Sequence, residues 1–348
     1  MDKQQKVRPK ILIIYTGGTI GMIESPTTHT LEPFDFSHLI DNVPKIKLLD
    51  YQIDSVTLNP PIDSSNMNPE HWRKIAETIE KNYRSYDGFV ILHGTDTMAY
   101  TASALSFMLE NLSKPVIITG SQLPIGEVRT DGEENLITAL QIAADRNQGG
   151  LPMVQEVAIL FENYLWRGNR STKMSADNFN AFKSNNYPAL AKIGLDIHYN
   201  EDALLRTTEH RPLRVHTNLE RGVLFLDLFP GITEESLRHQ LSTPGVKGIV
   251  LKTFGAGNAP TAKWFIDSLA DAVKEGKVIV NVTQCVNGGV HHLYQSSDGL
   301  VSSGIVSGHD ITAEAAITKL MYLFGMGLEA ADVADHFGHS ICGELTEL

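Results

Sequence analysis

Short apolar segments that alternate with helical patterns constrain the fold of this chain more than any other feature. The clearest apolar segments are five or six residues long and lie at Lys10–Tyr15, Gly88–Leu92, Pro115–Thr119 and Val157–Phe161. The stretches between them have apolar residues three and four positions apart, at 69–83, 99–112 and 133–146. Such segments are typical of strands buried on both faces, and the wider spacing is typical of the helices that cover them. The pattern predicts an α/β fold around a parallel sheet.

A polar stretch at 198–221 interrupts this pattern with many charges and little apolar periodicity. The pattern then restarts, with strands expected at 222–228, 247–252 and 277–282 and helices at 234–241, 259–275 and 313–324. We therefore expect a larger N-terminal domain at 1–200, a linker at 201–221 and a smaller C-terminal α/β domain at 222–348.

The start of the first expected helix is marked by two residues. Asn68 is a favoured N-cap residue, since its side chain can accept from free N–H groups of the first turn. Pro69 suits the first helical position, where no N–H donor is needed.

The charge balance argues against nucleic acid and membrane partners. The chain has 29 Lys plus Arg against 41 Asp plus Glu, a formal net charge of −12. A surface of this charge repels phosphate backbones and anionic lipid. No apolar stretch approaches the roughly 18 residues of a membrane-spanning helix.

Cysteine and histidine spacing gives no sign of a disulfide framework or a metal site. Cys285 and Cys342 form no CxxC pair, and no secretory leader pattern is visible, so we expect a reduced, cytoplasmic setting. His336 and His339 fall in a helical pattern without a third ligand candidate. We expect neither metal nor cofactor.

In open parallel sheets ligands bind beyond the carboxyl ends of the strands, so the loops there are the first candidates for chemistry. The loop after the first strand reads Thr16-Gly17-Gly18-Thr19-Ile20-Gly21. It matches neither the GxGxxG pattern nor a Walker motif, which makes a nucleotide site a weak interpretation. The loop is either a Gly-rich turn with a capping threonine or a turn that presents the Thr19 hydroxyl near backbone N–H donors.

The loop after the next strong strand, His93-Gly94-Thr95-Asp96-Thr97, adds a carboxylate to hydroxyl groups. Asp96 can pair with a substrate α-ammonium through a charge-assisted hydrogen bond, or it can cap the helix that follows. The sequence leaves these alternatives open. For His93 we favour a hydrogen-bonded histidine at a strand end over a catalytic base.

Two further polar loops flank the expected elements. Asp63-Ser64-Ser65 precedes the first long helix, and Arg167–Lys173 follows the fourth strand. Lys173 can be an ordinary solvated surface charge. A desolvated lysine can instead act as a base toward a threonine hydroxyl.

Taken together, these loops resemble a known family. TGGTI at 16–20 and GFVILHGTDTM at 88–98 are similar to the two signature segments of bacterial-type L-asparaginases. The resemblance continues through PIDSSNM, RGNRSTK and KTFGAGNAP, spans nearly the whole chain, and is strongest to the cytoplasmic type I branch.

The resemblance implies a larger flavodoxin-like N-terminal domain and a smaller C-terminal α/β domain. It also implies hydrolysis of L-asparagine to L-aspartate and ammonia without metal or cofactor. Members of the family form homodimers, usually paired into homotetramers, with active sites shared between subunits.

By position, the resemblance implies a nucleophile at Thr19 and a second catalytic group made of Thr95, Asp96 and Lys173. Asp63, Ser64 and Ser65, with Thr95 and Asp96, would bind the substrate, and Asn258 would reach a neighbouring subunit's site. Some type I members also bind asparagine at a second, activating site. The matching positions here are Thr172, Lys252, Thr283, Gln284 and Cys285.

The chain departs from the family pattern in two places. Family members often carry a tyrosine in the lid about ten residues after the nucleophile, whereas the lid here, 24–30, has none. A lid hydroxyl, His29 or a distant tyrosine are the candidates for activating Thr19. Lys252 stands where the activating site has an arginine, and lysine cannot make the planar bidentate contact to a carboxylate.

Two other functions are the alternatives to an L-asparaginase. One is a broader asparaginase–glutaminase or a related amidotransferase subunit, although the acidic charge argues against a role on RNA. The other is an amino-acid sensor that kept the pocket and lost the chemistry.

Overall fold

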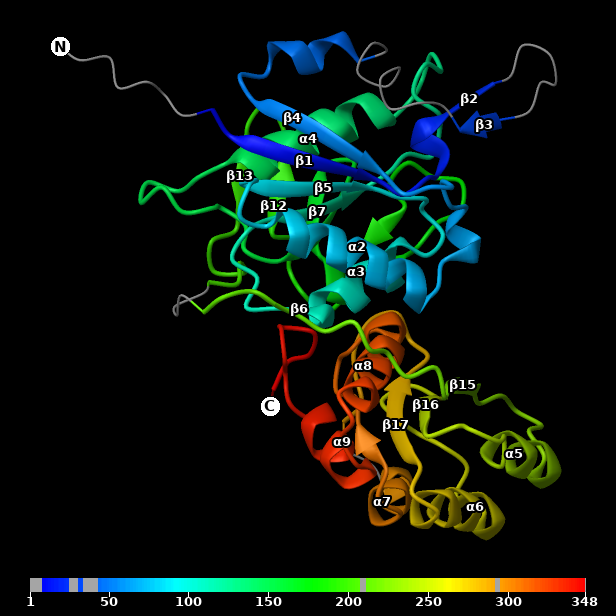
Figure 1. The fold of residues 1–348 in the computed structure, drawn as a ribbon. Coiled ribbons are helices and arrows are strands. Elements are labelled where there is room, and N and C mark those ends of the chain that lie inside the picture. Colours follow the sequence, from blue (N-terminus) through cyan, green and yellow to red (C-terminus); the bar gives the residue numbers. More distant parts are fainter. Residues whose placement is uncertain (1–7, 25–30, 34–42, 207–210, 292–294, 348) are drawn as a thin grey trace. The chain divides into compact units, whose positions relative to one another are not determined.

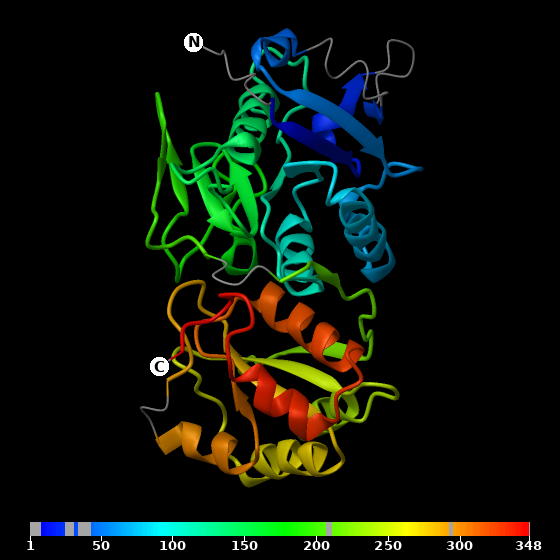
Figure 2. The ribbon, with the colours of Figure 1, turned by 60° about the vertical axis from the view of Figure 1, so that its left-hand side comes forward.

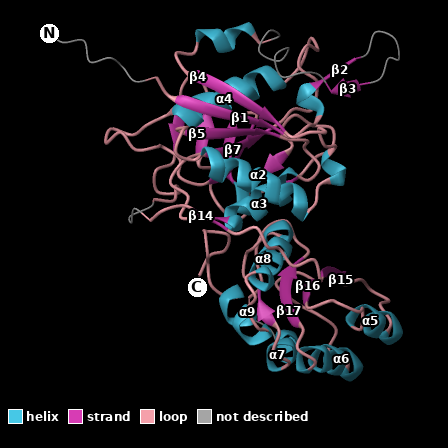
Figure 3. Cartoon of the chain, in the orientation of Figure 1, coloured by secondary structure: helices cyan, strands magenta, loops and turns pink. Residues whose placement is uncertain are grey.

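The chain folds into two compact units, each with its own sheet. A computed structural model describes residues 8–24, 31–33, 43–206, 211–291 and 295–347. The first unit extends to Ser184 and resumes at Pro188–Val215, and the second comprises Asn185–Tyr187 and the chain from His216 onward. Figures 1 and 2 show the chain from two sides, and Figure 3 distinguishes its helices from its strands.

An eight-stranded sheet forms the centre of the first unit, in the order β13-β12-β9-β8-β7-β5-β1-β4. The strands are β1 (Lys10–Tyr15), β4 (Gln52–Thr57), β5 (Gly88–Leu92), β7 (Val116–Thr119), β8 (Val157–Phe161), β9 (Tyr164–Arg167), β12 (Ala191–Ile193) and β13 (Ile197–Tyr199). The five from β4 to β8 pair in parallel, and the remaining three pair antiparallel. In chain order the parallel strands stand as 2-1-3-4-5, which is the flavodoxin-like arrangement. The expected α/β class is confirmed.

Within the described part of the first unit, three helices cover this sheet: α2 (Pro69–Asn82), α3 (Met98–Met108) and α4 (Gly132–Ala144). Helices α2 and α3 lie together in front of the strands in Figure 1, and α4 lies behind them. The Asn68 carboxamide accepts from the N–H groups of Glu70 and His71, which confirms the predicted N-cap of α2.

The predicted helix 99–112 is too long. It ends at Met108, and the next two residues form β6 (Leu109–Glu110), which pairs with β14 (Arg214–Val215). Asn111 then adopts a left-handed φ of 63°, which a helix cannot continue through. Part of the expected linker, 201–221, therefore belongs to the first unit as β14, because a two-residue strand leaves no apolar pattern in the sequence.

The second unit is built on a four-stranded parallel sheet in the order β15-β16-β17-β18. Its strands are β15 (Val223–Asp227), β16 (Gly248–Thr253), β17 (Val278–Thr283) and β18 (Val306–Ser307). Its helices are α5 (Glu234–Leu241), α6 (Lys263–Lys274), α7 (Gln295–Ser302), α8 (Ala313–Gly325) and α9 (Ala330–Phe337). Helices α8 and α9 lie side by side in Figure 2, while α5 and α6 bury Leu237 and Phe265 in the core.

The predicted helix 259–275 begins too early in the sequence. Residues Phe254 and Asn258 exchange two backbone hydrogen bonds, so the chain reverses after β16 and the helix starts only at Lys263. The remaining short elements are β2 (Met22–Glu24), β3 (Leu31–Pro33), β10 (Thr172–Lys173) and β11 (Phe182–Lys183), with 3-10 turns at Thr19–Gly21, Pro44–Leu48, Ser64–Asn66 and Gly168–Arg170.

Candidate active site

The loops after β1 and β5 meet where the strand order of the large sheet reverses. Gly17 and Gly18 have φ angles of 124° and 92°, which only glycine adopts readily. A Cβ on Gly17 would lie 2.2 Å from the carbonyl oxygen of Ile62, and one on Gly18 would lie 2.4 Å from the amide nitrogen of Gly94. Gly18 thus lets the loops after β1 and β5 touch through their backbones, and Gly17 allows the same approach to the segment that follows β4. Thr19 follows directly, half-buried, at the start of a 3-10 turn.

His93 holds the second of these loops from inside the fold. The Gly94 carbonyl can only accept, so His93 Nδ1 carries the ring proton and donates to it at 2.6 Å. In the neutral ring Nε2 is then the acceptor, and Thr101 Oγ1, which itself accepts from Trp72 Nε1 at 2.9 Å, donates to it at 2.8 Å. Burial lowers the pKa of His93 to about 4, so the ring is neutral. The structure agrees with the predicted strand-end histidine.

The turn at 63–66 packs against the same loop. The Asp63 carboxylate accepts from the Ser65 N–H at 3.0 Å, which lowers the pKa of Asp63, and the carboxylate itself stays exposed. Thr97 Oγ1 donates to the Ser64 carbonyl at 2.7 Å, and the Ser64 side chain is buried against Gly94.

Lys173 reaches the loop after β5 from the hairpin formed by β10 and β11. Its Nζ donates to Thr95 Oγ1 at 2.9 Å and to Asp96 Oδ1 at 2.6 Å. Only 18% of the Lys173 side chain is exposed, so it is not an ordinary surface charge. Asp96 is not the N-cap of α3, because that position belongs to Thr97. Its 66%-exposed carboxylate instead pairs with Lys173 and stays open to a cationic ligand.

Gln122 is a residue of this site that sequence reasoning missed. Thr95 Oγ1 donates to Gln122 Oε1 at 3.3 Å, and Gln122 Nε2 donates to the Asn178 carbonyl at 3.0 Å. The Gln122 backbone N–H donates to Asp131, a carboxylate whose pKa is raised by burial. Its position in the sequence could have identified it, because Gln122 follows β7 and β7 is the neighbour of β5 in the sheet.

The other predicted residues lie elsewhere in the fold. Asn258 belongs to the reversing turn of the second unit. Thr172 belongs to β10 of the first unit, and the proposed lid is described only at Glu24, since 25–30 lie outside the described residues.

Four predicted activating-site residues gather at the carboxyl ends of β16 and β17. Lys252 Nζ pairs with Asp227 on the adjacent strand at 2.7 Å. Gln284 Nε2 donates to the Lys252 carbonyl at 2.9 Å. Thr283 Oγ1 accepts from the Cys285 N–H at 3.0 Å, and Cys285 is exposed with a free thiol.

The described residues contain neither a metal-binding cluster nor a membrane-spanning helix. No group of three or more His, Cys, Asp or Glu side chains among them is arranged to hold a metal ion. Of the helices in the described part of the chain, none has the length and apolar character needed to cross a bilayer.

Comparison with known proteins covers both units. The chain matches the family models "Asparaginase, N-terminal" over residues 10–205 and "Glutaminase/Asparaginase C-terminal domain" over 222–337. L-asparaginase 1 of Escherichia coli (strain K12) is 42% identical over 343 residues, 97% of this chain and 98% of that protein. The 60 kDa lysophospholipase of Mus musculus is 40% identical over 97% of this chain and 62% of its own length. L-asparaginase I of Vibrio cholerae superposes with a TM-score of 0.89 at 40% identity, covering 98% of this chain and 100% of that one.

Proposed function

Since the chain belongs to the asparaginase family and is an L-asparaginase, an amidohydrolase, we propose that it hydrolyses L-asparagine through a covalent intermediate on Thr19. The observation that carries this proposal is the contact of Lys173 Nζ with both Thr95 and Asp96. That contact lies on the loop whose backbone touches the Gly17–Gly18 turn just before Thr19.

In the proposed reaction, the O–H bond of Thr19 breaks as Thr19 Oγ1 forms a bond to the carboxamide carbon of the substrate. The C–N bond then breaks, the nitrogen takes up one proton, equal in number to the one lost by Thr19, and leaves as ammonia, and an aspartyl ester remains on Thr19. Water then adds to the ester and releases L-aspartate, returning a proton to Thr19. Negative charge develops on the carboxamide oxygen in this reaction, and we propose that backbone N–H groups of the loops after β1 and β5 stabilise it by hydrogen bonding. None of these steps needs a metal or cofactor.

The proposed role of Lys173 is to polarise Thr95. Its Nζ donates to Thr95 Oγ1, while the hydroxyl proton of Thr95 points to Gln122. A donated hydrogen bond from an ammonium makes Thr95 a stronger proton donor toward the departing nitrogen. This geometry favours polarisation over removal of the Thr95 proton by Lys173.

Substrate binding is assigned to the exposed carboxylates and the serine turn. Asp96 and Asp63 offer negative charge to the substrate ammonium. Ser64 and Ser65 offer hydroxyl groups to its carboxylate.

Ammonia release from L-asparagine by wild-type and Thr19→Ala protein tests the proposal. We expect the variant to lose activity while calorimetry still detects asparagine binding, and Thr243→Ala, at an exposed threonine, to match the wild type. Full activity of Thr19→Ala would remove Thr19 from its role. Binding by the folded wild type without ammonia release would instead favour the amino-acid sensor.

The same assay with L-glutamine defines the substrate range. One extra methylene is worth only about 1–3 kcal/mol in a pocket, so we expect weaker turnover of glutamine rather than none. Equal kcat/KM for both amides would indicate the broader asparaginase–glutaminase.

We further propose that asparagine activates the enzyme at Lys252, Thr283, Gln284 and Cys285, together with Thr172. Support comes from the position of the first four residues, which gather at the ends of β16 and β17 and are joined there by hydrogen bonds of the Gln284 side chain and the Cys285 N–H. An asparagine carboxylate must compete with Asp227 for Lys252, so activation should need high substrate concentration. A sigmoidal rate curve that becomes hyperbolic in Lys252→Met would support this site, and a hyperbolic wild-type curve would contradict it.

Assembly and location are also part of the proposal. We propose a cytoplasmic homodimer or homotetramer in which Asn258 completes the active site of a neighbouring subunit. Sedimentation velocity would show the expected assembly, and a purely monomeric active enzyme would contradict it.

A further inference from the structure

The hairpin that carries Lys173 is too short to fix its own position. Strands β10 and β11 are joined by only two residue pairs, Thr172 with Lys183 and Lys173 with Phe182. Short isolated strand pairs are marginally stable in water. The placement of Lys173 Nζ therefore depends on what holds the two ends of the hairpin.

One end of the hairpin is held within the first unit, where Gln122 Nε2 donates to the carbonyl of Asn178. At the other end the chain leaves that unit directly after Ser184. The next three residues, Asn185–Tyr187, belong to the second unit, and the chain returns at Pro188. The chain that follows β11 directly is therefore held by contacts of the second unit.

Asn186, at the centre of the excursion, uses its whole carboxamide to bind backbone groups. Its Nδ2 donates to the carbonyls of Gly288 at 2.8 Å and Asp310 at 3.0 Å. Its Oδ1 accepts from the Gly288 N–H at 2.8 Å. Two donors and one acceptor of a single side chain are thus paired, and Gly288 is held by both its N–H and its carbonyl.

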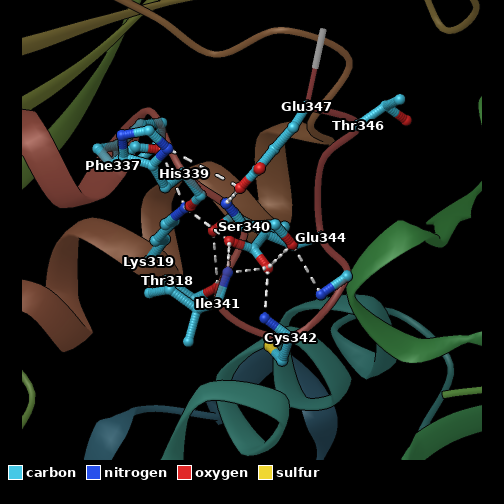
Figure 4. Close-up of polar contacts among 12 residues, drawn as sticks. Thr318, Lys319, Phe337, His339, Ser340, Ile341, Cys342, Glu344, Thr346 and Glu347 are labelled. Carbon is cyan, nitrogen blue, oxygen red and sulfur yellow. Dashed lines mark hydrogen bonds and ion pairs between the residues drawn. The ribbon is translucent and has the colours of Figure 1, made fainter. Parts of the chain in front are cut away.

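The loop that receives Asn186 is itself anchored by the C-terminal segment, residues 340–347. The Asp310 carboxylate accepts from the backbone N–H and the hydroxyl of Thr346, both at 2.7 Å. Figure 4 shows how this segment is held: the Glu344 carboxylate accepts from Lys319 Nζ at 2.6 Å and from the Cys342 N–H at 2.8 Å. Lys319 and Glu344 are both completely buried, so breaking this ion pair would leave a buried charge unpaired.

We propose that Asn186 is a positioning residue for Lys173, acting through β11 and held in turn by the anchored 308–310 loop. The inference rests on the proposed function, in which Lys173 Nζ must keep its contact with Thr95. Loss of the Asn186 hydrogen bonds frees the end of β11, and with it the strand paired to Lys173. A displacement of about 1 Å in a reacting group can cost on the order of 100-fold in rate.

Steady-state kinetics of Asn186→Ala test the proposal, with Asn200→Ala, at an exposed asparagine, as the matched control. We expect kcat to fall about 10- to 100-fold in Asn186→Ala, while KM changes less than about threefold. Asn186→Asp keeps the acceptor and loses both donors, so it should show most of the loss. The control should behave as wild type. A kcat within twofold of wild type in folded Asn186→Ala would overturn the proposal.

A second variant distinguishes the loss of this specific contact from a general loss of protein stability. Thr346→Val removes the hydroxyl that donates to the Asp310 carboxylate. It should therefore also lower kcat, by a smaller factor than Asn186→Ala does. Because both changes act through one anchor, the double variant should be no worse than Asn186→Ala alone. Strictly additive losses would show independent structural damage and would count against the proposal. If Asn186→Ala fails to fold, Asn186→Asp and Thr346→Val decide the question.

Hydrogen exchange tests whether Asn186 holds the hairpin, independently of whether the enzyme hydrolyses asparagine. Backbone amides of 172–183 should exchange faster in Asn186→Ala than in Asn200→Ala, whatever reaction the site performs. Unchanged exchange there would overturn the anchoring, whereas faster exchange in a protein without asparaginase activity would overturn only the proposed function.

Discussion

The imidazole of His93 lies at the carboxyl end of β5 with both ring nitrogens hydrogen-bonded inside the fold. The hydrogen bond from Nδ1 holds the Gly94 carbonyl in place, and with it the start of the loop that carries Thr95 and Asp96. A neutral ring suits this role, because a protonated Nε2 could no longer accept from Thr101.

His93 therefore predicts a loss of stability in mild acid. Well above pH 6.5 the ring is neutral in the folded and unfolded states and contributes nothing to the pH dependence. As the pH falls from 6.5 toward 4, the unfolded chain binds a proton that the folded chain does not, since burial lowers the folded pKa to about 4. The free energy of unfolding should fall by up to about 3 kcal/mol over this range.

Urea unfolding between pH 4 and 7 measures this effect against His93→Gln, which cannot titrate. The variant should have a lower free energy of unfolding at pH 7 and a flatter dependence on pH. The same pH dependence in both proteins would show that His93 titrates normally.

Lys173 gives the second prediction at the scale of single residues. Lys173→Met removes both donated hydrogen bonds, to Thr95 and to Asp96. We expect kcat to fall by about 100- to 10,000-fold, the range for a positioned proton-transfer group. Lys183→Met, at an exposed lysine of the partner strand, should leave kcat unchanged. A loss below tenfold in Lys173→Met would contradict the role assigned to Lys173.

At the scale of elements, the turn after β1 depends on glycine for two separable reasons, its φ and its lack of a side chain. Gly276 has a φ of 90°, close to that of Gly18, but an added Cβ there meets nothing within 4 Å. Gly276→Ala should cost about 1 kcal/mol from backbone strain alone. Gly18→Ala should cost a further 1–3 kcal/mol from the clash with Gly94 and should reduce activity.

Denaturant unfolding and ammonia release on the two variants measure this difference. Equal loss of stability in both would mean that the two loops can move apart. Full activity of Gly18→Ala would show that close approach of these loops is not needed for catalysis.

Several helices and strands could be predicted from the local sequence pattern alone. The predicted bounds of β1, β5, β8 and α5 are those of the structure, because each has an uninterrupted apolar or helical pattern between polar residues. The pairs β6–β14 and β10–β11 have two residues per strand and no such pattern. The strands of the first pair are also about a hundred residues apart in sequence, so no local pattern could have joined them.

At the scale of the whole molecule, the proposed sharing of sites between subunits predicts complementation. Thr19→Ala and Asn258→Ala should each have little activity alone. After unfolding and refolding together, half of randomly assembled dimers are hybrids with one intact site of two, so the mixture should regain about a quarter of wild-type activity. Ammonia release by the refolded mixture measures this. A mixture no more active than its components would place Asn258 in its own subunit's site or outside any site.

The sequence by itself determined the α/β class, the presence of a parallel sheet, and which strand-end loops carry hydroxyl and carboxylate groups. Those features follow from apolar periodicity and from the rule that parallel strands present their carboxyl ends at one edge. Family resemblance grouped Lys173 with Thr95 and Asp96. Only the tertiary structure decided the atoms through which they meet, that Gln122 accepts from Thr95, and that Asn186 binds the backbone of Gly288. These contacts join residues at least 27 positions apart. Local sequence carries no signal for such pairs, because the packing of whole elements selects the side chains that meet.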